Sequence, residues 1–147
     1  MSHELRLRTD IDPAYTWDAT SVFADDAAWE AAIADAEAQI PALQAFTGRV
    51  QEGPDELLAA LAQMESLVKC MGKVFVYASM HWTVDTTDTK ATAMMGRARS
   101  LMGKVQAAIA FIDPELLAIE ESVFQDWLAT EPDLAVYAHY YDCLLYT

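Results

Sequence analysis

The stretch Pro54–Trp82, PDELLAALAQMESLVKCMGKVFVYASMHW, decides the fold that we predict for this chain. Pro54 suits the first turn of a helix, and Asp55 and Glu56 complement the positive end of the helix dipole. Large apolar residues then recur at spacings of 4 and 3, at Leu57, Leu61, Met64, Val68, Met71, Phe75, Ala78 and Trp82. Because this period places them on one helical face, the pattern predicts a long helix with a partner along its length.

A second patterned segment follows a short polar turn, Asp85-Thr86-Thr87-Asp88. Its apolar residues keep the same spacings, at Met94, Ala98, Leu101, Val105, Ala108 and Ile112. Two long helices joined by a short turn pack antiparallel, so a helical hairpin is expected. Gly96 and Gly103 lie on a neighbouring face, where each costs the helix about 1 kcal/mol relative to alanine. They predict that another helix approaches the backbone closely there.

The segment before this hairpin predicts a third long element. Asp25 or Asp26 is a suitable N-cap residue. One helical face then carries Trp29, Ile33, Ala36, Ile40 and Leu43. Pro41 interrupts the pattern, and because an interior proline costs a helix about 3 kcal/mol, it predicts a kink or a restart.

The two ends of the chain are patterned differently from its centre. Residues 1–24 contain a proline and many Asp, Thr and Ser residues, so they predict an extended lead-in, followed by a single helical domain over residues 25–147. Short helices are expected at Leu116–Ile119, through Trp127 and after Pro132. The predicted fold class is all-α: an antiparallel helical bundle built on a long helical hairpin, with short helices at the C-terminal end.

The last helical pattern continues to the end of the sequence without a capping glycine, so the domain is expected to be cut short within its last helix. Apolar residues of that helix would then lack their normal neighbours. We therefore predict exposed apolar surface around Tyr137, Tyr141 and Leu145, which form a candidate interface.

Composition excludes several classes of function. The chain has 147 residues, of which 54% are hydrophobic, and a formal net charge of -14. An acidic surface repels phosphates, so nucleic acid and anionic membrane surfaces are not expected partners. The sequence lacks an apolar run of about 18 residues and an N-terminal signal segment, which favours a cytoplasmic protein. Cys70 and Cys143 belong to no CxxC pair and are expected to be free thiols.

The sequence contains no motif that carries catalysis. The zinc signature HExxH, the nucleotide-binding GxGxxG, the Walker loop and the GxSxG elbow are all absent. His139 and Cys143 are four residues apart and could share a helical face as a base and a nucleophile, which is the weakest hypothesis. Asp85 and Asp88 could hold a cation, but helix capping explains them better. No catalytic, cofactor-binding or metal-binding residue is therefore predicted on this chain.

Several stretches, in order, resemble the amino-terminal helical region of the oligoendopeptidase F family of zinc peptidases. Trp17–Thr20 with Trp29 is similar to the family's W-D-L-T lead-in and first helix. Tyr77–Asp88 resembles its Y-A-S-M…D-T turn between two long helices. Phe111–Ile119 is similar to its F-I-x-P-E-L helix start, and Leu134–Tyr140 resembles the L-x-x-Y-x-H-Y segment that follows.

The resemblance implies that catalysis belongs to a carboxy-terminal domain that this chain does not contain. Members of the family hold zinc through an HExxH pair and a downstream glutamate in a carboxy-terminal catalytic domain, and none of these positions exists here. Tyr77, Asp85 and Thr86 match the family's turn motif, and the resemblance carries no catalytic residue over to this chain. The amino-terminal helices of the family form one side of a deep channel that admits short peptides.

The expected function is therefore that of a noncatalytic amino-terminal domain of an oligoendopeptidase F-like zinc metalloendopeptidase, forming a wall of the channel for short peptides. Its expected partner is the missing catalytic domain, and zinc would belong to that domain. The alternative is a standalone helical module that interacts with itself or with another chain.

Overall fold

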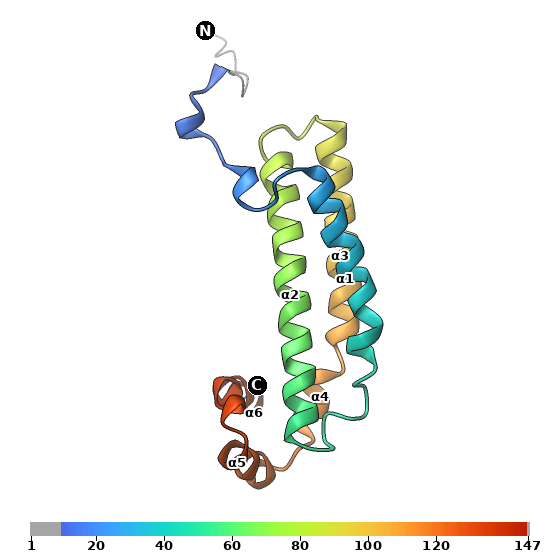
Figure 1. Cartoon of the computed structure of the whole chain (residues 1–147), viewed down its shortest axis with the longest axis vertical. Helices are drawn as coiled ribbons and strands as arrows, with labels where there is room; N and C mark the ends of the chain where they lie inside the picture. The colour runs from blue at the N-terminus through green and yellow to red at the C-terminus, as the bar shows by residue number, and fades with distance from the viewer. Residues whose placement is uncertain (1–9, 147) are drawn as a thin grey trace.

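Three long helices lie side by side and form the body of the protein in the computed structural model, which describes residues 10–146 (Figure 1). They are α1 (Asp26–Gln44), α2 (Pro54–Trp82) and α3 (Thr89–Ile109). α2 and α3 run antiparallel, and α1 packs against both. Residues 10–146 contain no β-strand, so the predicted all-α bundle built on a helical hairpin is confirmed.

Short elements lie at both ends of this body (Figure 1). A lead-in with two single-turn 3-10 helices contacts α2 near its C-terminal end, and the short C-terminal helices gather near the start of α2. The bounds of these elements are η2 (Pro13–Tyr15), η3 (Ala19–Ser21), α4 (Ile112–Leu117), α5 (Glu121–Thr130), η4 (Pro132–Tyr137) and α6 (Ala138–Leu145). Among the described helices, none is both long and apolar enough to cross a membrane.

Carboxylates cap two of the long helices. The Oδ1 atom of Asp25 accepts a hydrogen bond of 2.8 Å from the N–H of Ala28 at the start of α1. Asp88 accepts bonds of 2.7 and 3.2 Å from the N–H groups of Lys90 and Ala91 at the start of α3. A side-chain cap of this kind contributes about 1 kcal/mol, so these residues fix where the helices begin.

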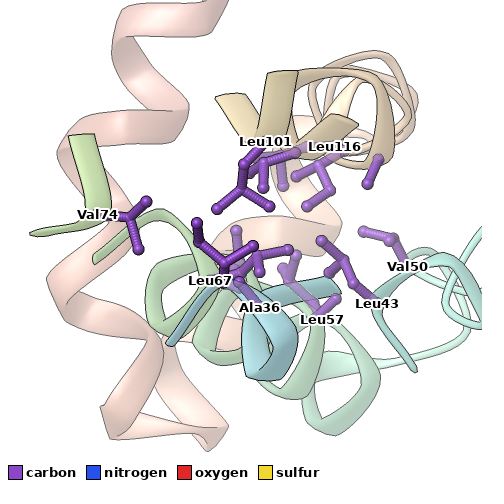
Figure 2. Packing of buried hydrophobic residues seen from close by; sticks show 14 of the residues in the cluster. Ala36, Leu43, Val50, Leu57, Leu67, Val74, Leu101 and Leu116 are labelled. Carbon is purple, nitrogen blue, oxygen red and sulfur yellow. The ribbon is translucent and has the colours of Figure 1, made fainter. Parts of the chain in front are cut away.

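The core lies between the three long helices and is closed at one end by α4 and the α1–α2 loop. Figure 2 shows Leu43, Leu57, Leu67, Leu101 and Leu116 pointing into a common interior. The buried residues of α3 include every residue up to Ala108 that the spacing predicted: Met94, Ala98, Leu101, Val105 and Ala108. On α1 the predicted face is buried except for the half-buried Ile40.

The face that α2 buries differs in part from the predicted stripe. Leu57, Leu61 and Ala78 are buried as predicted, but the other buried residues lie on a neighbouring stripe: Ala60, Leu67, Val74 and Tyr77. The remaining members of the predicted stripe are only half-buried: Met64, Val68, Met71, Phe75 and Trp82. α2 is apolar on two neighbouring faces, so its period alone does not decide which one meets α1 and α3.

Of the two alternatives predicted at Pro41, a kink or a restart, the restart does not occur, because α1 continues through Pro41 and ends three residues later, at Gln44. The predicted close approach of another helix at Gly96 and Gly103 is wrong. A Cβ atom built at Gly96 or Gly103 would meet no atom within 4 Å. Both glycines are exposed, so no helix packs against them and their cost to α3 is not offset by a close approach.

This exposure generates a stability prediction. Gly96→Ala and Gly103→Ala should each raise the free energy of unfolding by about 0.5–1 kcal/mol, because alanine loses less backbone entropy than glycine in a helix. Urea unfolding followed by circular dichroism measures the change.

Gly48→Ala is the matched control for this prediction. It also has open space around a built Cβ, but its φ of 80° lies in the left-handed region, where a side chain costs about 1–2 kcal/mol. Gly48→Ala should therefore destabilise the chain. A loss of stability in Gly96→Ala or Gly103→Ala would contradict the assignment of an open α3 face.

Candidate functional site

An apolar groove lies where the lead-in meets the face of α2 that is turned away from α1 and α3. It has a volume of about 470 Å³ and is lined by Trp17, Val22, Phe75, Val76, Ser79, Met80 and Thr83. Val76 is 47% exposed and Trp17 is 65% exposed. The groove therefore presents apolar side chains that the described chain leaves in contact with solvent.

A smaller and more polar hollow adjoins the groove. Its volume is about 220 Å³, and its lining residues are Trp17, Ala19, Met80, His81, Val84, Asp85 and Asp88. Trp17 and Met80 line both spaces. The sequence did not predict the groove because it depends on where the lead-in docks. The sequence feature that indicates the groove is the presence of further apolar residues on α2, such as Val76 and Met80, outside the predicted stripe.

Tyr77 is the centre of a polar network on the neighbouring, buried face of α2. Its hydroxyl donates a hydrogen bond of 2.9 Å to Oδ1 of Asp26, and the ammonium of Lys90 donates to Oδ2 of the same carboxylate. The rings of Phe23 and His81 also form edge-to-face contacts with the ring of Tyr77, with centroids 5.6 and 4.7 Å away. The network therefore ties the start of α1, the end of α2 and the start of α3 together.

The network shifts the acidity of its members. The hydrogen bond from Lys90, followed by that from Tyr77, lowers the pKa of Asp26. Burial, followed by the hydrogen bond to Asp26, raises the pKa of Tyr77 to about 12. The phenol and the carboxylate therefore keep the protonation states that their hydrogen bond requires across the physiological range of pH.

The other two residues of the turn motif shape the connection between α2 and α3. Asp85 accepts hydrogen bonds from the hydroxyl and the N–H of Thr87, at 2.6 and 2.9 Å, and the bond from the hydroxyl is the main cause of its lowered pKa. The carbonyl oxygen of Thr86 accepts a bond of 3.4 Å from the hydroxyl of Thr92. These contacts fit a turn that is held by its own side chains.

The candidate interface on the last helices is exposed only in part. Tyr141 is fully buried: its ring stacks on Phe124 with centroids 3.9 Å apart, and its hydroxyl donates to the carbonyl oxygen of Ile119 at 3.0 Å. The predicted exposure of Tyr141 is therefore wrong, because α5 and α6 bury it between them. Tyr137 is half-buried, and Leu145 is 44% exposed.

The reactive side chains of residues 10–146 include a histidine with a buried ring nitrogen and an exposed histidine–cysteine pair. Within the part of the chain that the structure describes, no group of three or more His, Cys, Asp or Glu residues could hold a metal ion. The Nε2 atom of His81 is buried without a hydrogen-bond partner among the described residues. His139 and Cys143 do meet, with Nε2 and Sγ 3.6 Å apart, and both side chains are exposed.

The raised pKa of Tyr77 generates a prediction about alkaline stability. The folded chain keeps the phenol proton up to a pH of about 12, whereas an unfolded chain releases it near pH 10. The stability that Tyr77 contributes is therefore complete below about pH 10 and is lost as the pH rises toward 12. Tyr77→Phe should show a smaller loss of unfolding free energy than the unsubstituted chain over this interval, measured by urea titration at each pH.

Tyr15→Phe is the control, because Tyr15 is 84% exposed. Its stability should fall with pH as steeply as that of the unsubstituted chain. Equal slopes for Tyr77→Phe and the unsubstituted chain would contradict the assigned role of the network.

Comparison with known proteins identifies relatives over nearly the whole chain. No protein-family model matches it. The group B oligopeptidase PepB of Streptococcus agalactiae is 34% identical over 135 residues, which are 92% of this chain and 22% of that protein. The oligopeptidase PepF of Bacillus subtilis is 26% identical over 138 residues, 94% of this chain and 21% of that protein.

Solved structures show the same fold. A candidate peptidase from Chlamydophila abortus superposes with a TM-score of 0.80 at 26% identity, over 95% of this chain and 24% of that one. Oligoendopeptidase F from Enterococcus faecium superposes with a TM-score of 0.75 at 24% identity, over 82% of this chain and 24% of that one. The chain spans between a fifth and a quarter of the length of these relatives. Its homologues therefore include oligoendopeptidase F and the oligopeptidases PepB and PepF, each matched over one segment.

Proposed function

We propose that this chain is a noncatalytic, amino-terminal helical segment of an oligoendopeptidase F-like zinc peptidase, where it forms one wall of a channel for short peptides. The extent of the matches supports a partial role: they cover 92–95% of this chain but only 21–24% of the curated relatives. The peptidase activity of such a protein then belongs to polypeptide outside the matched segment.

The observation that carries the proposal is the apolar groove on α2. Phe75, Val76 and Met80 line it from α2, and Val76 is 47% exposed. Burying a large apolar side chain contributes about 1.5–3 kcal/mol, and exposed apolar patches of this kind mark interaction surfaces. We assign the groove to an apolar segment of the catalytic part of the peptidase.

A channel wall requires helices with a fixed relative position. Ion pairs between α1 and α3 meet this requirement. Lys104 contacts Glu37 at 2.6 Å, and Arg97 forms a two-point contact with Glu30. Lys90 makes a third pair with Asp26. Exposed pairs contribute little stability individually, but these three recur along the two helices and fix their relative position.

The first test is a peptide-hydrolysis assay of this chain with added Zn²⁺. We expect no turnover above that of zinc in buffer, because the proposal assigns the catalytic groups to other polypeptide. Turnover that a chelator abolishes would overturn the noncatalytic assignment.

The second test is a chimera in which the 135 matching residues of this chain replace the corresponding segment of the Streptococcus agalactiae oligopeptidase. The chimera should hydrolyse oligopeptides. Val76→Asp in the chimera should reduce hydrolysis about tenfold or more, because a carboxylate in the groove would be desolvated without a partner.

Val123→Asp is the matched control in the chimera. Val123 lies on α5, away from the groove, and is 37% exposed, so the substitution should leave hydrolysis unchanged. A folded chimera without hydrolysis, or equal activity of the two aspartate variants, would count against the proposal. Circular dichroism checks folding in each case.

The second candidate function is a standalone module that pairs with itself. The observation that favours it is exposed apolar surface next to α6: Val136 is 77% exposed and Tyr146 is 91% exposed. Light scattering at two protein concentrations separates a monomer from a self-associating module.

A further inference from the structure

Two metal-binding side chains already have the spacing of a chelate on α6. The Nε2 atom of His139 and the Sγ atom of Cys143 are 3.6 Å apart, and both residues are exposed. Zinc binds sulfur at about 2.3 Å and imidazole nitrogen at about 2.0–2.1 Å, so a tetrahedral site separates the two atoms by about 3.6 Å. The pair can therefore bind a zinc ion without a change of rotamer.

The rest of α6 holds this pair at the surface. On the opposite side of the helix, Tyr141 is buried against Phe124 and donates a hydrogen bond to Ile119. Tyr140 donates to the Oδ1 atom of Asp113 at the start of α4. These contacts fix the rotation of α6 about its axis, so His139 and Cys143 face solvent.

One chain supplies only half of a zinc site. A structural zinc ion takes four protein ligands, and the described residues of one chain offer no group of three His, Cys, Asp or Glu that could hold a metal. Within residues 10–146 the pair therefore lacks two of the four ligands, and another molecule can supply them. A second copy, related by a two-fold axis, brings the same pair and completes a Cys₂His₂ set.

The surface around the pair also suits a second copy. Val136 and Tyr146, the exposed residues that flank the pair, continue its spacing as 136, 139, 143 and 146. Val136 belongs to the 3-10 helix η4 and Tyr146 follows the end of α6, so the two residues lie beyond either end of the helix that carries the pair. Apolar contacts would thus lie on both sides of the metal. The dication also opposes the repulsion between two chains that each carry a net charge of -14.

We propose that Zn²⁺ joins two copies of this chain through His139 and Cys143 of each α6. Each thiol releases its proton to the solvent on binding, each imidazole binds as the neutral ring, and no electron is transferred. This surface is separate from the groove on α2, so the pairing holds or fails independently of the proposed channel function.

The experiment measures the mass of the chain by light scattering, in a reducing buffer, with and without half an equivalent of Zn²⁺. The metal should double the mass, and a chelator should restore the monomer. Co²⁺ serves as the optical probe: thiolate-to-cobalt absorption in the near ultraviolet, together with intense visible bands, reports tetrahedral coordination by sulfur.

His139→Gln and Cys143→Ser should each abolish the doubling of mass and the cobalt bands. Both residues are exposed, so neither substitution disturbs the core. Cys70→Ser is the matched control: this thiol is half-buried and donates to the carbonyl oxygen of Ala32 at 3.5 Å, so the variant should pair as the unsubstituted chain does.

Three results would overturn the proposal. The first is a mass that Zn²⁺ does not change. The second is pairing that persists in Cys143→Ser. The third is a dimer that resists the chelator and dissociates with stronger reductant, since it would be a disulfide between two Cys143 residues.

Discussion

The indole of Trp29 is the point at which the three long helices meet, and the rest of the architecture depends on its burial. The ring belongs to α1, is fully buried, and donates from Nε1 to the carbonyl oxygen of Val74 on α2 at 2.9 Å. It stacks on Tyr77, and the guanidinium of Arg97 on α3 lies 5.1 Å from its centroid. One large side chain thereby sets the spacing of all three helices and selects which face of α2 turns inward.

That selection explains why apolar surface is left over. α2 has apolar residues on two neighbouring faces, and the core accepts the one that carries Val74 and Tyr77. The other face is covered by the lead-in near its C-terminal end and by η4 near its N-terminal end. Phe75, Val76 and Met80 line the groove that remains. The candidate docking surface is thus a consequence of core packing on the neighbouring face of the same helix.

The sequence predicted the elements well because helical period and capping act locally. The α3 stripe, the caps at Asp25 and Asp88 and the hairpin all follow from residues that are close in the chain. Prediction from the sequence failed where contacts between residues distant in the chain determine which side chains are buried. The inward face of α2, the burial of Tyr141 against Phe124 and the groove beneath Trp17 each need a partner distant in sequence. The prediction that another helix approaches the glycines of α3 failed for another reason. The fold does not compensate the cost of these glycines to helix stability.

The lead-in has a further mechanical consequence. Neither η2 nor η3 contains a buried residue, and the lead-in packs against the core mainly through Val22 and Phe23, just before α1. Trp17, which it carries, lines both hollows on α2. The width of the groove is therefore set by where the lead-in docks, and the packing of the three-helix body does not depend on it.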